Sequence, residues 1–378
     1  MHVWDALATD SKIDFSAPPP SSNSQSVIAY MTENPNLTRA LLAQLDSLEP
    51  VANFEKSSVA SIHLPPPPPS PETLNLSSYP HITLSSGGPP LAARLLVGAD
   101  GLNSPVRTFA HIPTRGWDYN RHGVVATVRL RPSSDPNSYA SSAPQTHDHA
   151  TAYQRFLPTG PIALLALPGD YATLVWSTTP SRAAHLKLLS PPDFVAMVNA
   201  AFRLSMVDVD YMSTLPCNQT DELEWRSSIT GATSEDSIRY PRSVLSVQEN
   251  SIASFPLRLR HADRYISSRV ALVGDAAHTI HPLAGQGLNM GLADVASLAR
   301  TIEDTLVHGG DIGVEGNLEG YEGEMWSRNN RMLGVVDKLN KLYGVRWGPV
   351  VGVRGWGLGM VDRWEGLKGV IMGQAGGG

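Results

Sequence analysis

Cysteine is almost absent from this chain of 378 residues, because Cys217 is the only one. A single cysteine excludes an intramolecular disulfide and fits a reducing compartment. Long apolar runs are also missing, since none reaches the roughly 18 residues that a membrane-spanning helix needs. The formal net charge is −6, with 29 basic and 35 acidic side chains. This balance predicts no nucleic-acid partner.

Other familiar signals are missing as well. Asp5, Asp10 and Asp14 give the first residues an acidic character that a mitochondrial targeting segment avoids. The chain has no convincing Ser/His/Asp or Cys/His arrangement, so we expect no side-chain nucleophile. His278 and His281 could suggest a metal site, but no third ligand cluster accompanies them, and two ligands are weak evidence. We therefore predict neither a catalytic side chain nor a bound metal.

The most informative segment that is present runs from Arg269 to Met290. Val270–Val273 reads as a short buried strand of a parallel sheet, and Gly274-Asp275 follows at its carboxyl end. Gly285-Gln286-Gly287 then opens a predicted helix that ends at Gly309-Gly310. The apolar positions of that helix recur on one face, at Leu288, Leu292, Val295, Ala299, Ile302 and Leu306. Small glycines and helix-start amides suit an anion or an electron-rich ring.

A second block has the same form. Leu95–Gly98 is an apolar strand that runs into Asp100-Gly101, with Arg107 downstream. Taken alone, an Asp-Gly turn after a strand is common and carries little information. Together with the later Gly-Asp segment it becomes a candidate cofactor contact, with Arg107 acting through charge-assisted hydrogen bonds.

In their order, the two blocks resemble the flavin-binding signature of the class A flavoprotein monooxygenases. The string His281-Pro282-Leu283-Ala284-Gly285-Gln286-Gly287-Leu288-Asn289 is most similar to the branch that hydroxylates ubiquinone precursors. The resemblance implies FAD as cofactor, with Asp275 at the ribityl chain and the Gly285–Asn289 segment beside the flavin ring. The cofactor-binding residues that it implies are Asp100, Arg107, Gly274, Asp275, Pro282, Gly285, Gln286, Gly287, Leu288 and Asn289. The alternative is a generic strand-turn-helix without a ligand.

The resemblance also implies the fold and its division. It predicts an α/β chain with a para-hydroxybenzoate-hydroxylase-like FAD-binding fold, an interleaved β-sheet substrate domain and C-terminal helices. We expect residues 1–90 to be a partial substrate-domain or connector region and residues 91–115 a segment of the FAD domain. Residues 116–262 would form the substrate-domain sheet, 263–310 the second FAD-domain segment, and 311–378 a C-terminal helical region.

One part of the family pattern is missing. Members begin with a strand and a Gly-X-Gly-X-X-Gly loop that holds the FAD pyrophosphate, and no such loop precedes Asp100. We therefore expect a chain that is truncated at its N-terminus, with an incomplete first dinucleotide-binding unit.

The function implied by the resemblance is FAD-dependent hydroxylation of an aromatic ring with dioxygen. The substrate would be a polyprenylated hydroxybenzoate-type intermediate of ubiquinone biosynthesis. The electron donor would be NAD(P)H or a ferredoxin, and a ubiquinone-biosynthesis complex is a further partner. The implied location is the matrix side of the mitochondrial inner membrane, at its surface. Two alternatives stay open: a weakly active or inactive chain that serves as a component of the complex, and another FAD-dependent oxidoreductase on the same fold.

Local patterns predict further elements. Leucines at helical spacing indicate a helix from Asn36 to Leu48 with Asn36 as its N-cap. Residues 123–128 and 172–176 read as strands, and residues 133–149 and 214–236 as polar loops. The apolar and basic tail from Leu333 to Ala375 fits either a helix pair that closes its own core or a surface for a membrane or partner.

Overall fold

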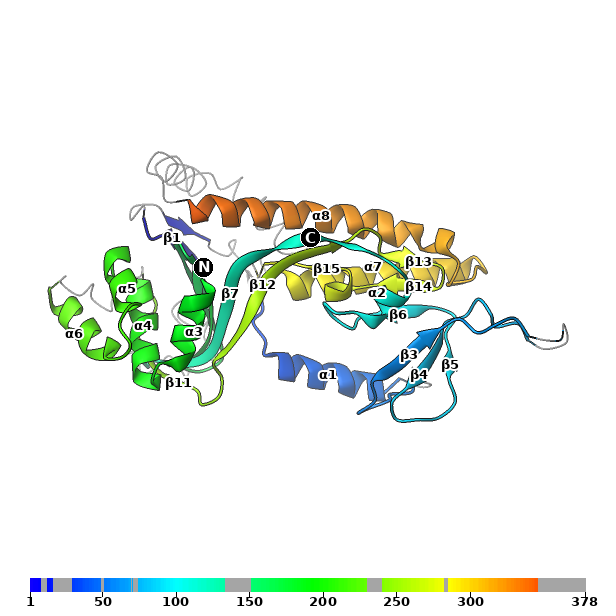
Figure 1. The fold of residues 1–378 in the computed structure, drawn as a ribbon, viewed down its shortest axis with the longest axis horizontal. Coiled ribbons are helices and arrows are strands. Elements are labelled where there is room, and N and C mark those ends of the chain that lie inside the picture. Colours follow the sequence, from blue (N-terminus) through cyan, green and yellow to red (C-terminus); the bar gives the residue numbers. More distant parts are fainter. Residues whose placement is uncertain are drawn as a thin grey trace, which may run out of the picture.

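A computed structural model gives the fold and describes residues 1–7, 12–15, 29–48, 51–68, 70, 74–132, 151–229, 240–281 and 285–345. Within these residues the strands form one sheet of nine strands and two of three strands. The large sheet lies with four helices at one end of the molecule, and the two small sheets lie toward the other (Figure 1). The predicted α/β class is confirmed.

The nine-stranded sheet has the order β15-β12-β7-β10-β9-β8-β1-β2, with β11 paired to β7. All its pairs are antiparallel except that of β1 with β8. The predicted strands 123–128 and 172–176 are confirmed as parts of β7 and β10. The strands are β1 (His2–Asp5), β2 (Lys12–Asp14), β7 (Thr114–Leu130), β8 (Tyr153–Leu157), β9 (Gly160–Ala166), β10 (Tyr171–Thr178), β11 (Val244–Val247), β12 (Ala253–Ala262) and β15 (His278–Thr279).

Four helices pack beside this sheet: α3 (Pro180–Leu188), α4 (Pro191–Arg203), α5 (Met206–Met212) and α6 (Gln219–Ile229). The hydroxyls of Thr179, Ser190 and Ser205 accept backbone N–H groups at the starts of α3, α4 and α5. Phe194 and Phe202 of α4 are buried with Val124 and Trp176 of the sheet, which makes the larger hydrophobic core.

The prediction of a polar loop over residues 214–236 is wrong, because α6 occupies residues 219–229. The sequence of α6 has few apolar residues; Leu223 packs against the larger core, and ion pairs support the helix as well. Arg226 pairs with Glu222 one turn earlier, at 2.7 Å, and with Asp208 of α5. Residues 133–149 lie outside the described residues.

The smaller unit around the two predicted motifs contains a three-stranded sheet in the order β13 (Ile266–Ser267), β14 (Val270–Leu272), β6 (Leu96–Gly98). Three helices accompany it: α2 (Pro105–Phe109), α7 (Gly287–Val307) and α8 (Glu315–Gly344). Its core includes Tyr265, Leu272 and Tyr321, and the predicted burial of the strand at residues 270–273 is confirmed. Strand β6 is the edge of this sheet in the described part of the chain.

Helix α7 begins and ends where the sequence predicts, at Gly287 and just before Gly309-Gly310. Of the predicted apolar face, only Ile302 packs against the core. Its other large side chains are about half exposed, while α7 buries Met290, Asp294, Ser297, Leu298 and Thr305 instead. We call the half-exposed set, Leu288, Leu292, Val295 and Leu306, the outer face of α7. The periodic pattern located an apolar face on α7, but the sequence of one helix does not show what packs against that face.

Helix α1 (Asn34–Asp46) lies near a third sheet of β3 (Val59–His63), β4 (His81–Leu84) and β5 (Leu91–Ala92), and it buries none of its residues. The prediction of this helix is confirmed, but Asn36 as its N-cap is wrong. The N-cap is Glu33, because Pro35 is suited to the first turn, where its missing N–H costs nothing. None of the described helices is long and apolar enough to cross a membrane.

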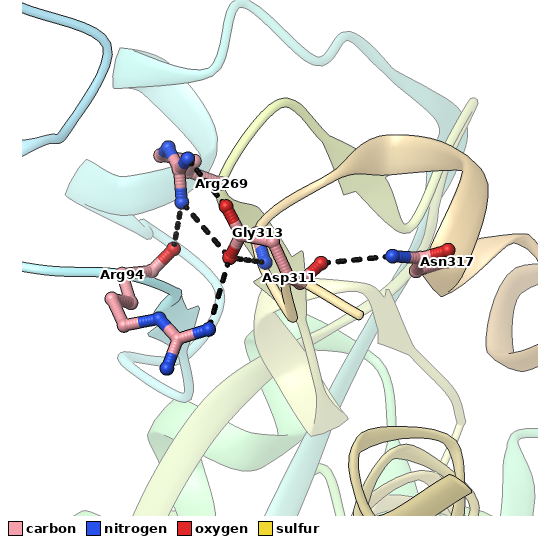
Figure 2. A network of polar contacts seen from close by, with 5 residues as sticks. All are labelled: Arg94, Arg269, Asp311, Gly313 and Asn317. Carbon is pink, nitrogen blue, oxygen red and sulfur yellow. Dashed lines mark hydrogen bonds and ion pairs between the residues drawn. The ribbon is translucent and has the colours of Figure 1, made fainter. Parts of the chain in front are cut away.

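A polar cluster ties the connection between α7 and α8 to the small sheet (Figure 2). The Asp311 carboxylate accepts hydrogen bonds from Arg269, at 2.7 Å, and from Arg94, at 3.4 Å. The Gly313 amide donates to the same carboxylate, and Arg269 stacks over the ring of Tyr79. These contacts lower the pKa of Asp311 to about 2, chiefly through the hydrogen bond from Arg269.

Candidate functional site

The two sequence motifs meet at one edge of the small sheet. Strands β6 and β14 pair in parallel, with Leu96 opposite Val270 and Gly98 opposite Leu272. The Val273 amide extends the ladder by donating to the Gly98 carbonyl at 2.9 Å. Because parallel neighbours have their carboxyl ends at the same edge, Asp100 and Asp275 follow side by side. Segments more than 170 residues apart in the chain therefore form one surface.

The Gly-Asp turn is a single turn of 3-10 helix over Gly274–Ala276. Gly274 has φ of +59°, a left-handed conformation that a side chain disfavours. Asp275 lies at the surface while Ala276 is buried, so the turn presents the carboxylate outward. Partial burial raises the pKa of Asp275, and nearby His278 opposes that shift.

The Asp-Gly block supports this turn. Asp100 accepts a hydrogen bond from the Val106 amide at the start of α2, at 3.1 Å. Arg107 donates to the carbonyl of Ala276 at 2.7 Å and to that of Leu102 at 2.6 Å. Its guanidinium therefore joins the two motifs, and burial lowers its pKa. Direct contact of Asp100 and Arg107 with a cofactor remains a prediction.

The start of α7 lies beside the same edge. Gly285, Leu288 and Asn289 are exposed, Gln286 is buried, and Gly287 is the first helical residue. Among the described residues, a methyl group built on Gly285 would meet no atom within 4 Å, and one on Gly287 would meet only Ile280, at 3.8 Å. Contacts with the described protein atoms therefore do not require a glycine at 287. The open space at this position is suited to a ligand. Pro282 lies outside the described residues.

A buried polar network lies behind the turn, and sequence reasoning missed most of it. Asp294 of α7 accepts hydrogen bonds from the Gly274 amide (2.9 Å), from His278 Nε2 (2.6 Å) and from Asn329 Nδ2 (2.9 Å). Asn329 of α8 also donates to the Tyr265 hydroxyl at 3.2 Å. The one available signal was Asp294 itself, a carboxylate next to apolar positions of a predicted helix.

The two histidines considered for a metal have other surroundings. His278 contacts Asp294, as described above. His281 is buried against the ring of Tyr119, with ring centroids 5.1 Å apart. Burial, and secondly the charge of Arg121, lower the pKa of His281 to about 4. The residues given a structure contain no group of three or more His, Cys, Asp or Glu that could hold a metal.

Comparison with known proteins identifies the family. Residues 80–332 match the family model described as FAD binding domain. The chain is 43% identical over 311 residues to the ubiquinone biosynthesis monooxygenase COQ6 of Saccharomyces cerevisiae, covering 79% of this chain and 62% of that protein. It is 36% identical over 373 residues to the human protein of the same name, covering 98% of this chain and 74% of that protein.

The chain belongs to the ubiquinone biosynthesis monooxygenase family. It spans less than two thirds of the yeast COQ6 protein. FAD is the cofactor that the matched domain binds.

Solved structures agree on the fold. The chain superposes on pqsL, a probable FAD-dependent monooxygenase from Pseudomonas aeruginosa, with a TM-score of 0.54, 20% identity and coverage of 86% and 72% of the two chains. With p-nitrophenol 4-monooxygenase PnpA from Pseudomonas putida DLL-E4 the TM-score is 0.59, with 15% identity and coverage of 89% and 70%. The predicted fold class is confirmed.

Proposed function

We propose that this chain is an FAD-dependent aromatic-ring monooxygenase that acts on a polyprenylated hydroxybenzoate-type intermediate of ubiquinone biosynthesis. The observation that carries the proposal is the parallel pairing of β6 with β14, which brings the Asp-Gly and Gly-Asp turns to one edge beside the start of α7. Family membership supports the reaction class, and the COQ6 relatives are named for this pathway.

The chain's own residues would bind and orient the cofactor. The exposed Asp275 carboxylate is suited to accept hydrogen bonds from the hydroxyls of the ribityl chain. The first amides of α7 have no partner within the helix and carry partial positive charge, which favours the electron-rich end of the ring. When bound, FAD supplies the oxygen-transfer chemistry, and the protein positions the reactants and excludes water.

A pocket of about 410 Å³ supports an aromatic substrate on the side of the large sheet. It is lined by Trp117, Tyr119, Arg121, Leu157, Pro161 and Tyr343, among others. Tyr119 joins this pocket to His281, which directly precedes the Pro282–Ala284 segment of the flavin motif. Aromatic walls with a nearby cation suit a ring that carries an acidic substituent. We propose that residues 116–262 form the substrate side of the molecule.

Dioxygen and an external donor, NAD(P)H or a ferredoxin, complete the proposed reaction. The relatives are named mitochondrial. We propose a position on the matrix side of the inner membrane, at its surface and within a ubiquinone-biosynthesis complex.

A second candidate is a component of that complex with little activity of its own. It is favoured by apolar surfaces that no described residue covers: the outer face of α7, the edge strand β6 and helix α1, which has no buried residue.

One experiment separates the two candidates. The chain is purified and its flavin absorbance measured before and after incubation with excess FAD. With FAD bound, it is then tested with reductant, dioxygen and a short-chain prenyl hydroxybenzoate. A hydroxylated product detected by mass spectrometry supports the monooxygenase, and flavin binding with no product contradicts it.

A further inference from the structure

Asp294 is a carboxylate with no exposed surface, in the middle of α7. Burying a charge is unfavourable unless its oxygens are well hydrogen-bonded. Here they are, because Oδ2 accepts from the Gly274 amide and from His278 Nε2, and Oδ1 accepts from Asn329. These three partners come from the Gly-Asp turn, from β15 and from α8.

The partners explain why the residue is an acid. Two of the three contacts, the backbone amide and the side-chain amide, come from groups that can only donate, and the imidazole donates through Nε2. An ionised carboxylate accepts on both oxygens and donates nothing. An asparagine at 294 would keep only one, neutral, acceptor for Gly274 and His278, and its N–H₂ group would require the Asn329 amide to turn over.

The contact with Gly274 connects the network to the cofactor edge. Helix α7 passes close to the turn at this point, since a methyl group on Gly291 would lie 3.3 Å from the Gly274 Cα atom. Asp294 follows Gly291 by three residues, on the same side of the helix. Its carboxylate therefore holds the peptide group between Val273 and Gly274, one residue before Asp275.

The far end of the network is anchored elsewhere. Asn329 donates to the Tyr265 hydroxyl, which leaves the hydroxyl proton for His261 Nε2, at 2.9 Å. Tyr265 and His261 lie at β13 and β12 and make no hydrogen bond to the turn. The network thus has a turn end, at Asp294, and a far end, at Tyr265.

We propose that Asp294 is a positioning residue that fixes the Gly274–Asp275 turn in the orientation that presents Asp275 to the flavin. The proposal rests on the proposed function only in naming FAD as the ligand that Asp275 meets. The hydrogen bond that holds the turn is formed without any ligand. Asp294 touches no reacting group.

The test is amide hydrogen exchange, measured by mass spectrometry on peptides that cover residues 272–277, in the 378-residue chain. Asp294→Asn should speed exchange of the Gly274 amide by about tenfold, since the charged acceptor is replaced by a neutral amide oxygen. Tyr265→Phe is the matched control: it removes two hydrogen bonds at the far end of the same network, from Asn329 and to His261, and it should leave exchange at residues 272–277 within about twofold of the unmodified protein after correction for its Tm.

Equal exchange in Asp294→Asn and in the unmodified chain overturns the proposal. So does equal acceleration by Tyr265→Phe, because the network would then stabilise the region without holding the turn. If Asp294→Asn does not fold, Gly291→Ala decides. Its added methyl group would lie 3.3 Å from the Gly274 Cα and so push α7, with the Asp294 carboxylate, away from the turn. The hydrogen bond from the Gly274 amide should then lengthen and its exchange rise severalfold, and unchanged exchange overturns the proposal.

FAD titration of the same proteins keeps this result apart from the proposed function. If the unmodified chain takes up FAD, Asp294→Asn should weaken its affinity by about tenfold while Tyr265→Phe does not. If the unmodified chain takes up none even at high FAD, the proposed function fails, and the exchange data alone still decide whether Asp294 holds the turn.

Discussion

Asp275 is the exposed acid of the Gly-Asp turn, and its replacement tests the cofactor edge most directly. Asp275→Ala should weaken FAD binding by about ten- to over a hundredfold, because a hydrogen bond to a charged acceptor contributes roughly 1.5–3 kcal/mol. Quenching of flavin fluorescence measures the affinity. Asp304→Ala, at the exposed end of α7, is the matched control and should leave it unchanged. An unaltered titration curve for Asp275→Ala would contradict the role of this carboxylate.

Gly287, the first residue of α7, offers a second test of the proposed cofactor edge. Gly287→Val should reduce FAD affinity more than it reduces the Tm, since its side chain would enter space that no protein atom fills within 3.8 Å. Gly316→Val, near the start of α8 and also with open space around it, makes the same change in helix propensity. Calorimetry and flavin titration of both variants give the comparison. If Gly287→Val binds FAD as well as Gly316→Val, the start of α7 is not the flavin cradle.

At the scale of elements, hydrogen bonds to Asp311 attach the connection between α7 and α8 to the sheet of β13, β14 and β6. Asp311→Asn should lower the free energy of unfolding by about 1–2 kcal/mol at neutral pH, a modest value because the site is partly exposed. The folded pKa of Asp311 is about 2, below its ordinary 3.8. Its contribution is therefore complete above pH 3.8 and is lost as the pH falls toward 2. Urea denaturation at pH 7 and at pH 5 should give the same difference in free energy of unfolding between Asp311→Asn and the unmodified protein. A difference that changes between these pH values would contradict this role of Asp311.

Sequence patterns located the elements that have strong local signals. The strands at 96–98 and 270–272 and the limits of α7 follow from apolar runs that end at Gly-Asp, Asp-Gly and Gly-Gly. Helix α6 was missed because its sequence is mostly polar, and its one local helix signal, the pairing of Glu222 with Arg226 one turn later, is weaker than an apolar stripe. The contacts among Asp294, Asn329 and Tyr265 join segments tens of residues apart, which local patterns cannot pair.

For the whole molecule, two buried histidines set the response to acid. Burial lowers the pKa values of His261 and His281 to about 4, from an ordinary 6.5. Between pH 6.5 and 4 the unfolded chain binds protons that the folded chain does not, so stability falls as the pH falls through this window. Each histidine should contribute a slope of up to about 1.4 kcal/mol per pH unit. His281→Gln should reduce the slope of Tm against pH, whereas His308→Gln, at an exposed position, should not.

The residues before Asp100 lead to a further prediction for the whole molecule. The chain alone should bind FAD weakly, because no Gly-X-Gly-X-X-Gly loop precedes Asp100 to hold the pyrophosphate. Losing several charge-assisted hydrogen bonds of roughly 1.5–3 kcal/mol each moves a tight cofactor to micromolar affinity or weaker. Adding the N-terminal strand, loop and helix of a full-length COQ6 relative should give a yellow protein with one FAD per chain. Full occupancy without that addition would refute this expectation.

Strand β6 has one more consequence. Beyond its pairing with β14, the described part of the chain supplies no partner for its other edge, and Val97 is 40% exposed there. An open strand edge is a template on which strands of other molecules can add. Purified at high concentration, the chain should therefore self-associate, with light scattering that grows with protein concentration. Val97→Lys should suppress this aggregation at little cost to the fold, as edge lysines do in natural sheets.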